Sequence, residues 1–192
     1  VMGQAIDKSG IQFRMLNLSK GPAVRGPRAQ ADRKLYKKAV ITILNSQKNL
    51  QIVESSALDL LIKNNSIQGV KTAGDQTFYC KSLVLTTGTF LRGKIRLGKT
   101  SIPAGRIGDK PSIKLAEKIE KIGFSMGRLK TGTPPRILKK SINFKDLDIQ
   151  NGDNPPKPFS FISKKINVPQ ICCYLTHTNI NTHNIIKNNL NK

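Results

Sequence analysis

The chain of 192 residues is long enough for one ordinary domain with a sizeable core and too short for two full-sized ones. Its 33 Lys and Arg against 11 Asp and Glu give a formal charge of +22, which favours a polyanionic partner such as a nucleic acid. The sequence has no apolar run of roughly 18 residues, no signal-peptide pattern and too few cysteines for a disulfide framework, so we expect a reduced, cytoplasmic protein with no membrane partner.

The first predicted element is a helix that follows a stretch with little periodicity. Gly26-Pro27 predicts the helix start, with proline at the first helical position, and apolar residues recur at helical spacing from there to about residue 45. Its other faces are basic and include Arg28 and Arg33. Solvation alone would explain such a face, and an overuse of Lys, Asn and Ile along the whole chain would explain part of the charge.

A series of short strands follows this helix. The predicted strands are Leu50–Val53, Ala57–Lys63, Ile67–Ala73, Thr77–Cys80 and Leu83–Thr87. Asn64-Asn65 and Gly74-Asp75 supply turns between them. The last run is continuously apolar, which is typical of a strand covered on both faces. Where it ends, Thr86, Thr87 and Gly88 leave room for a ligand to approach the backbone, although any strand followed by a turn could look the same.

A second helix is predicted between Asp109, as its cap, and Gly123, which stops it. Ser112 lies at the start of this helix, where free N–H groups and the positive end of the helix dipole could receive a phosphate. An ordinary cap-region serine is the alternative interpretation.

The stretch 127–137 reads GRLKTGTPPRI and predicts a loop. Arg128, Lys130 and Arg136 surround a flexible turn and a stiff diproline, a pattern that suits a phosphate backbone or a charged cofactor. An exposed loop with solvated charges would have the same composition.

Cys172, Cys173 and His177 raise the question of a metal or a nucleophile. Adjacent cysteines cannot easily ligate one tetrahedral ion together, and the chain has no second cysteine pair. We therefore predict no metal site and favour structural cysteines over a Cys173–His177 nucleophile.

Four stretches of the chain closely resemble one protein family. They are IDKSGIQFRMLNLSKGPAVRGPRAQADRKLY, LTTGTFLRGKI, GRLKTGTPPRI and CYLTHTNINTH. The resemblance is to the MnmG/GidA family, the tRNA uridine 5-carboxymethylaminomethyl modification enzymes, and it covers essentially all 192 residues.

The resemblance implies a fold, cofactors and partners. It implies an FAD-binding α/β protein acting on the wobble uridine (U34) of tRNA, with NADH and methylene-tetrahydrofolate as further cofactors, and a homodimer that works with an MnmE-type GTPase. Family flavin contacts fall on Ala57 and Ser112, whereas Thr86, Thr87 and Gly88 are added from the geometry of a strand end. The basic residues expected to contact tRNA are Arg25, Arg28, Arg33, Arg128, Lys130 and Arg136.

The chain also departs from the family pattern. Members are about three times longer, begin with a strand and a GxGxxG loop, and carry catalytic cysteines in CNPAIGG and GPRYCPS segments, none of which occurs here. The expected fold is therefore the central part of a Rossmann-like FAD/NAD(P)-binding domain with a small β-rich insertion (residues 1–140), without its first βαβ unit. The start of an inserted second domain (141–192) would follow it.

Several functional interpretations stay open at this point. The first is an internal fragment of the tRNA-modifying flavoenzyme that is not catalytic alone, contributes no catalytic residue and binds FAD weakly or not at all. The others are a non-catalytic basic tRNA-binding remnant, a relic that does not fold stably, and a relative of the folate- and FAD-dependent tRNA uracil methyltransferases. The GRLKTGTPPRI and THTN segments fit the last of these less well.

Overall fold

The computed structural model describes residues 1–132, 134 and 136–190. They divide into two compact units, one formed by Val1–Gln51 with the described part of Pro135–Asn191, the other by Ile52–Pro134 without its undescribed residue 133. Each unit has its own sheets and its own small core. None of the described helices is long and apolar enough to cross a membrane.

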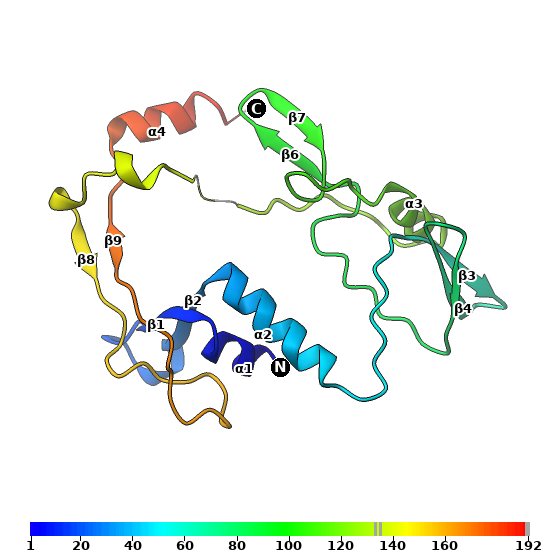
Figure 1. Cartoon of the computed structure of the whole chain (residues 1–192). Helices are drawn as coiled ribbons and strands as arrows, with labels where there is room; N and C mark the ends of the chain where they lie inside the picture. Colours follow the sequence, from blue (N-terminus) through cyan, green and yellow to red (C-terminus); the bar gives the residue numbers. More distant parts are fainter. Residues whose placement is uncertain (133, 135, 191–192) are drawn as a thin grey trace. The chain divides into compact units, whose positions relative to one another are not determined.

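The first unit is built from two segments that are far apart in the sequence (Figure 1). Its elements in chain order are α1 (Met2–Asp7), β1 (Gly10–Leu16), the 3-10 turn η1 (Pro22–Val24), β2 (Gly26–Ala31), α2 (Arg33–Asn45), the 3-10 turns η2 (Lys139–Ser141) and η3 (Phe144–Asp146), β8 (Asp148–Gln150), β9 (Cys173–Leu175) and α4 (Ile180–Lys187). Strands β1 and β2 pair antiparallel, and so do β8 and β9.

Strand β1 is the centre of this unit. Phe13 is 2% exposed, and its ring lies 5.9 Å from that of Phe159. The backbone of β1 also accepts hydrogen bonds from the distant segment, since the N–H of Asp153 donates to the Phe13 carbonyl at 2.7 Å and that of Ile171 to the Ile11 carbonyl at 2.8 Å. Residues about 140 to 160 positions apart are therefore held together by backbone bonds as well as by apolar contact.

The helix predicted from Pro27 begins six residues later, so that prediction was wrong at its start. Asp32 caps α2 by accepting the N–H groups of Lys34 and Leu35 at 2.8 and 2.9 Å. Residues 26–31 instead pair with β1, with Arg28 opposite Arg14. An aspartate cap is strong, and pairing with a partner strand satisfies the backbone of Gly26–Ala31 better than an extra helical turn.

The second unit contains a three-stranded sheet, a hairpin and a helix. Its elements in chain order are β3 (Ala57–Lys63), β4 (Ser66–Thr72), β5 (Thr77–Tyr79), β6 (Lys94–Leu97), β7 (Thr100–Pro103) and α3 (Ile113–Lys121). The order β3-β4-β5 is an antiparallel meander, and α3 packs against β3. The predicted turns are confirmed, since Asn64 and Asn65 both have positive φ (50° and 57°), as do Gly74 and Asp75 (80° and 60°).

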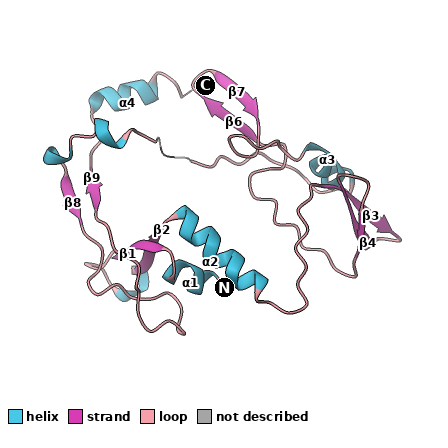
Figure 2. Cartoon of the chain, in the orientation of Figure 1, coloured by secondary structure: helices cyan, strands magenta, loops and turns pink. Residues whose placement is uncertain are grey.

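Two predicted strands are not present. Leu50–Val53 and Leu83–Thr87 are both irregular, and the second runs through the long loop between β5 and β6 (Figure 2). Val84 is 83% exposed, although its apolar run predicts burial on both faces. A central strand needs a hydrogen-bonded neighbour and covering layers, and within the described residues no strand pairs with this one.

Candidate functional site

The N-terminus of α3 is built into the loop that precedes β6. The N–H of Ser112 donates to the Phe90 carbonyl at 2.8 Å, and the Ser112 carbonyl accepts the N–H of Arg92 at 3.2 Å. Ser112 rather than Asp109 is the N-cap of the helix. Asp109 instead pairs with Arg106 at 2.6 Å. The Ser112 side chain makes no capping hydrogen bond. Its hydroxyl oxygen therefore does not accept a hydrogen bond from the first N–H groups of α3.

The same loop holds the residues predicted at the strand end. The Phe90 N–H donates to the Thr87 carbonyl at 3.2 Å, and the Phe90 carbonyl accepts from Ser112. Gly88 has a φ of 55°, a conformation that glycine adopts without strain. The Thr86–Gly88 segment and Ser112, 24 positions apart from Gly88, are thus joined through Phe90, even though the strand expected to deliver Thr86 and Thr87 is absent.

Two arginines fix this loop against the rest of the unit. Arg92 has a φ of 45°, which is uncommon for a residue with a side chain, and its carbonyl accepts both terminal N–H groups of Arg128 at 3.2 Å. Its guanidinium meets the Glu120 carboxylate at 2.7 Å, and this hydrogen bond raises the pKa of Arg92. Arg128 is therefore used inside the unit, where it joins the 127–132 stretch to Arg92 in the loop before β6.

Ala57, the other predicted flavin contact, is the half-buried first residue of β3. It lies opposite Thr72 on β4. Strand β3 is joined to α3 by an ion pair between Asp59 and Lys118 at 3.0 Å. Partial burial raises the pKa of Asp59, but the Lys118 ammonium and the Leu60 N–H outweigh it, so the pKa of this carboxyl is lowered overall. Ala57 and Ser112 therefore lie on two elements that pack together.

The six predicted tRNA contacts fall in both units. Arg25, Arg28, Arg33 and Arg136 belong to the first unit and Arg128 and Lys130 to the second. Arg25, Arg33, Lys130 and Arg136 are exposed. Arg28 is half-buried on β2, where its guanidinium donates to the side-chain oxygens of Gln12 and Gln150 at 3.4 Å. Like Arg128, Arg28 makes hydrogen bonds inside its own unit.

Cys173, the first residue of β9, is held by two side-chain hydrogen bonds. The Cys173 thiol donates to Gln12 Oε1 at 3.3 Å and accepts from Gln30 Nε2 at 3.2 Å. His183 Nε2 lies 2.8 Å from Thr178 Oγ1. Within the described part of the chain, no three His, Cys, Asp or Glu side chains gather as metal ligands would.

The hairpin formed by β6 and β7 is not among the strands predicted above. Lys94 and Arg96 alternate with Ile95 and Leu97, and a Gly-Lys pair separates the two strands. This alternation and the two-residue turn are the sequence signal of a β-hairpin.

Comparison with known proteins identifies the kind of protein that this arrangement belongs to. The sequence model of the family described as "Glucose inhibited division protein A" matches residues 1–192. The tRNA uridine 5-carboxymethylaminomethyl modification enzyme MnmG of Granulibacter bethesdensis is 51% identical over 195 residues, which cover 100% of this chain and 31% of that protein. Two crystal forms of GidA from Aquifex aeolicus match with TM-scores of 0.91 and 0.90 at 41% identity, over 100% of this chain and 33% of theirs.

The fold is that of a mixed α/β protein corresponding to part of a flavoprotein domain, as the sequence predicted. The chain belongs to the Glucose inhibited division protein A family, that is, to the MnmG/GidA family. It spans about a third of the length of the relatives that it matches.

Proposed function

We propose that this chain forms the central part of the FAD-binding domain of an enzyme that modifies the wobble uridine of tRNA to 5-carboxymethylaminomethyluridine. The observation that carries the proposal is the 51% identity to the Granulibacter MnmG over the whole of this chain. The likeness to Aquifex GidA over the same 192 residues supports an equivalent backbone.

The proposed contribution to FAD binding centres on the start of α3. An anionic or hydroxyl group of the cofactor fits there, because the Ser112 hydroxyl and the first N–H groups of the helix are not used in a cap and Gly88 permits close approach. Ser112, Thr86, Thr87 and Gly88 would hold that group, and Ala57 would contact the cofactor through its backbone. FAD, when bound, supplies the redox chemistry of the reaction. The residues of this chain bind and orient it, and we assign no catalytic residue among them.

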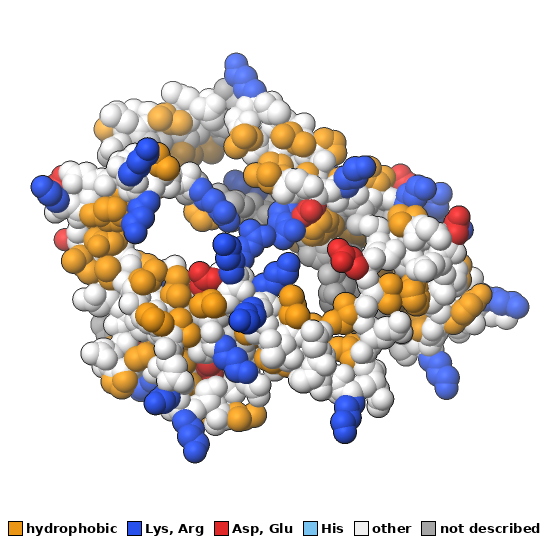
Figure 3. All heavy atoms as spheres, viewed as in Figure 1, with side chains coloured by type: hydrophobic (Ala, Val, Ile, Leu, Met, Phe, Trp, Pro, Cys, Tyr) orange, Lys and Arg blue, Asp and Glu red, His pale blue; other side chains and the backbone are white. Residues whose placement is uncertain are grey.

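The proposed contribution to tRNA binding is electrostatic. Lys and Arg side chains far outnumber Asp and Glu on the face that Figure 3 shows, in agreement with the formal charge of +22. Each cation that docks on a phosphate releases a counterion, so tRNA binding should be steeply salt-dependent. Of the six predicted contacts, Arg28 is half-buried and Arg128, although exposed, donates to the Arg92 carbonyl. We propose the other four, Arg25, Arg33, Lys130 and Arg136, for the RNA.

The remaining requirements belong to a longer protein. We propose that turnover needs the GxGxxG loop and the two cysteine segments of the family, with NADH and methylene-tetrahydrofolate as further cofactors. We also propose that the enzyme works as a homodimer with an MnmE-type GTPase, and that it acts in the cytoplasm, where its tRNA substrate is found. The division into a part of the FAD domain (residues 1–140) and the start of an inserted domain (141–192) is proposed on the same ground. FAD binding by the chain alone should be weak or absent.

A second candidate is a non-catalytic, basic tRNA-binding remnant, which the charge alone favours. It differs in predicting no flavin site at Ser112.

A chimera separates the two candidates. The 192 residues would replace the matching segment of the Granulibacter MnmG, and the purified chimera would be examined for flavin absorbance. If the chain is a segment of the enzyme, the purified chimera should be yellow and contain one bound FAD per chain. The Ser112→Ala chimera should retain less FAD. A folded, colourless chimera that still binds tRNA would favour the remnant.

A further inference from the structure

The first two turns of α2 carry a group of cations that we call the α2 basic face. It consists of Arg33, Lys34, Lys37 and Lys38, all of them exposed. At 3.6 residues per turn these side chains span about 140° of the helix circumference. Ala39, which is 7% exposed, lies on the opposite side of the helix, and α2 packs against α1 in the same unit (Figure 1). The α2 basic face therefore points away from the buried side of α2.

The charge of the α2 basic face is not neutralised by neighbouring carboxylates. The sequence has no Asp or Glu between Asp32 and Glu54. Among the described residues, no carboxylate forms an ion pair with any of the four side chains. The Asp32 carboxylate instead accepts the N–H groups of Lys34 and Leu35 at 2.8 and 2.9 Å. These N–H groups are occupied, so an anion would have to bind through the cationic side chains.

These cations work against the helix that carries them. Lys34 and Lys38 are four positions apart, as are Arg33 and Lys37, so like charges lie side by side on the helix surface. The N-terminal end of a helix dipole is positive, and the first turn of α2 contains no acidic residue that would offset it. Helix stability therefore does not explain this sequence. Solvation would be equally favourable at any exposed position, so it does not explain the grouping at the positive end of the helix either.

We propose that the α2 basic face is a docking surface for backbone phosphates of the tRNA. Phosphates that dock there neutralise the cations, which relieves the repulsion among them, and release counterions from the RNA. Three of the four cations are lysines, whose compact ammonium groups bind phosphate as point charges without the bidentate geometry of arginine.

The chemistry of this face indicates contact with the RNA backbone rather than with its bases. Side chains cannot read the bases of A-form RNA in its deep and narrow major groove, whereas phosphates are accessible along the whole strand. The RNA partner rests on the proposed function, which already assigns Arg33 to the tRNA. The inference adds Lys34, Lys37 and Lys38 and places all four cations on one surface.

The test measures tRNA binding by the full chain across a series of salt concentrations. Lys34→Gln/Lys37→Gln/Lys38→Gln removes three charges and preserves helix propensity, because glutamine and lysine are similar helix formers. This variant should weaken binding about tenfold or more at low salt and reduce the log–log salt slope by about 2 to 3, because three phosphate contacts are lost. Arg33 is left in place, so that the result reports on the lysines alone.

Two control variants are matched to the glutamine variant of α2. Lys157→Gln/Lys164→Gln/Lys165→Gln removes the same charge from exposed positions in the same unit, outside its helices and strands, and should leave the slope unchanged. Replacing the three lysines of α2 by arginine keeps the charge and should retain most of the affinity. Equal losses in the two glutamine variants would overturn the docking surface, and so would a loss in the arginine variant as large as that in the glutamine variant of α2.

Hydrogen exchange of the α2 amides separates a binding role from a structural one. In the glutamine variant of α2, exchange in the first two turns should be roughly two- to tenfold slower than in the wild type, because like-charge pairs are removed. Faster exchange together with an unchanged salt slope would show that the lysines stabilise the helix and would overturn the proposal.

The proposed function and the docking surface fail in different ways. Wild-type chain and chimera that both bind no tRNA would contradict the proposed function and the RNA assignment together. Binding with a wild-type salt slope in the glutamine variant of α2 would contradict the α2 basic face alone. The same variants in the chimera repeat the slope measurement in a protein that contains the remaining segments of the family.

Discussion

At the scale of single residues, a buried carboxylate in the first unit joins two segments that are far apart in the sequence. Asp7 is 5% exposed, and its two oxygens accept the N–H groups of Phe159 and Ser160 at 2.7 and 2.9 Å. Hydrogen bonds to a charged group contribute more than neutral ones, and a buried donor left without its partner is costly.

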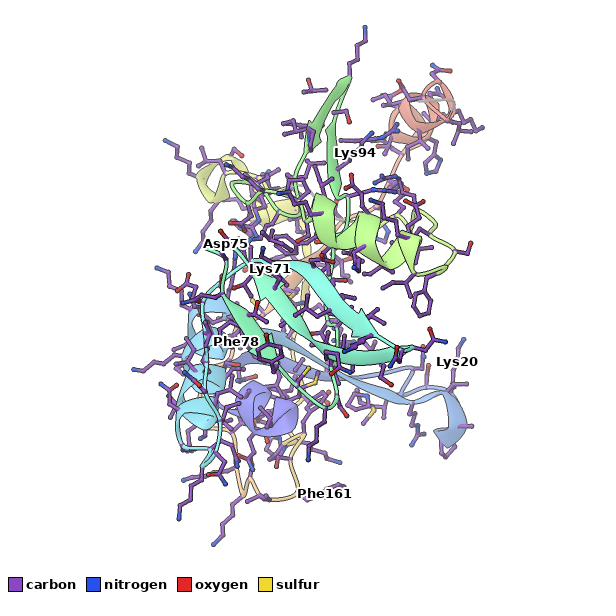
Figure 4. The ribbon with its side chains drawn as sticks, turned by 90° about the vertical axis from the view of Figure 1, so that its right-hand side faces the viewer. Lys20, Lys71, Asp75, Phe78, Lys94 and Phe161 are labelled. Carbon is purple, nitrogen blue, oxygen red and sulfur yellow. The ribbon has the colours of Figure 1, made fainter. Side chains whose placement is uncertain are left out.

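Asp7→Asn should therefore open this contact, because one carboxylate oxygen becomes an NH₂ group facing an N–H donor. We expect a local loss of about 1.5 to 3 kcal/mol, seen as roughly 10- to 150-fold faster hydrogen exchange at the amides of Phe159 and Ser160. Asp75→Asn, at an exposed ion pair with Lys71 at 3.0 Å (labelled in Figure 4), is the control and should leave those amides unchanged. Unaltered exchange in Asp7→Asn would contradict the bridging role.

A second residue-scale prediction concerns the base of the hairpin. Gly93→Ala would push a methyl group against the Thr89 and Ala104 carbonyl oxygens, at 2.4 and 2.6 Å, and should cost about 1 to 3 kcal/mol. Hydrogen exchange at Ala104 and Ser112 reports the loss. Gly127→Ala meets nothing within 4 Å and is the matched control. If the two variants behave alike, the close approach at Gly93 is not a constraint.

At the scale of elements, the N-termini of helices α2 and α3 are capped differently. Asp32 caps α2 through two hydrogen bonds, whereas Ser112 at the start of α3 makes none with its side chain. Asp32→Ala should cost about 1 kcal/mol, measured as faster exchange in the first turn of α2. Ser112→Ala should change helix stability by less than about 0.5 kcal/mol and should instead weaken flavin retention in the chimera. A large stability loss in Ser112→Ala would show that the serine is only a cap.

The contact between α3 and β3 should depend on pH. The pKa of Asp59 is lowered in the folded chain, so its contribution to stability is present above the unfolded value of 3.8 and is lost as the pH falls through the folded pKa. In urea unfolding, the free energy of unfolding of the wild type should exceed that of Asp59→Asn by only a small amount, because the ion pair is partly exposed. This difference should disappear at low pH. A difference that persists in acid would mean that packing rather than charge is responsible.

The elements also show what the sequence could predict. The Asn64-Asn65 hairpin, the Gly74-Asp75 turn and most of α3 follow from local chemistry and are confirmed. Strand β2 could not be separated from the helix after it, because its pairing with β1 is a tertiary contact. The sequence could not predict the link from Thr87 through Phe90 to Ser112 either, because this link depends on backbone hydrogen bonds between residues more than 20 positions apart.

At the scale of the whole molecule, both units leave large apolar side chains of the described residues exposed. The exposed apolar side chains include Val84, Leu97 and Phe161. Under the proposed function, other segments of a longer protein of the family would cover these side chains.

The isolated chain should therefore bind an apolar fluorescent dye strongly and unfold with low cooperativity. In the chimera the same 192 residues should bind little dye, because neighbouring segments cover the apolar surface. Dye binding that is equally low in both proteins would mean that the isolated chain buries its own surface and needs no further segments.

The most direct test of the central claim is the level of 5-carboxymethylaminomethyluridine in tRNA from cells whose only MnmG is the Granulibacter chimera carrying these 192 residues. We predict that the modified nucleoside is present at a level close to that of the unaltered Granulibacter enzyme, and that it falls when Ser112→Ala is introduced. A folded, abundant chimera with no modified wobble uridine would contradict the assignment of this chain to the FAD-binding domain of a tRNA-modifying enzyme.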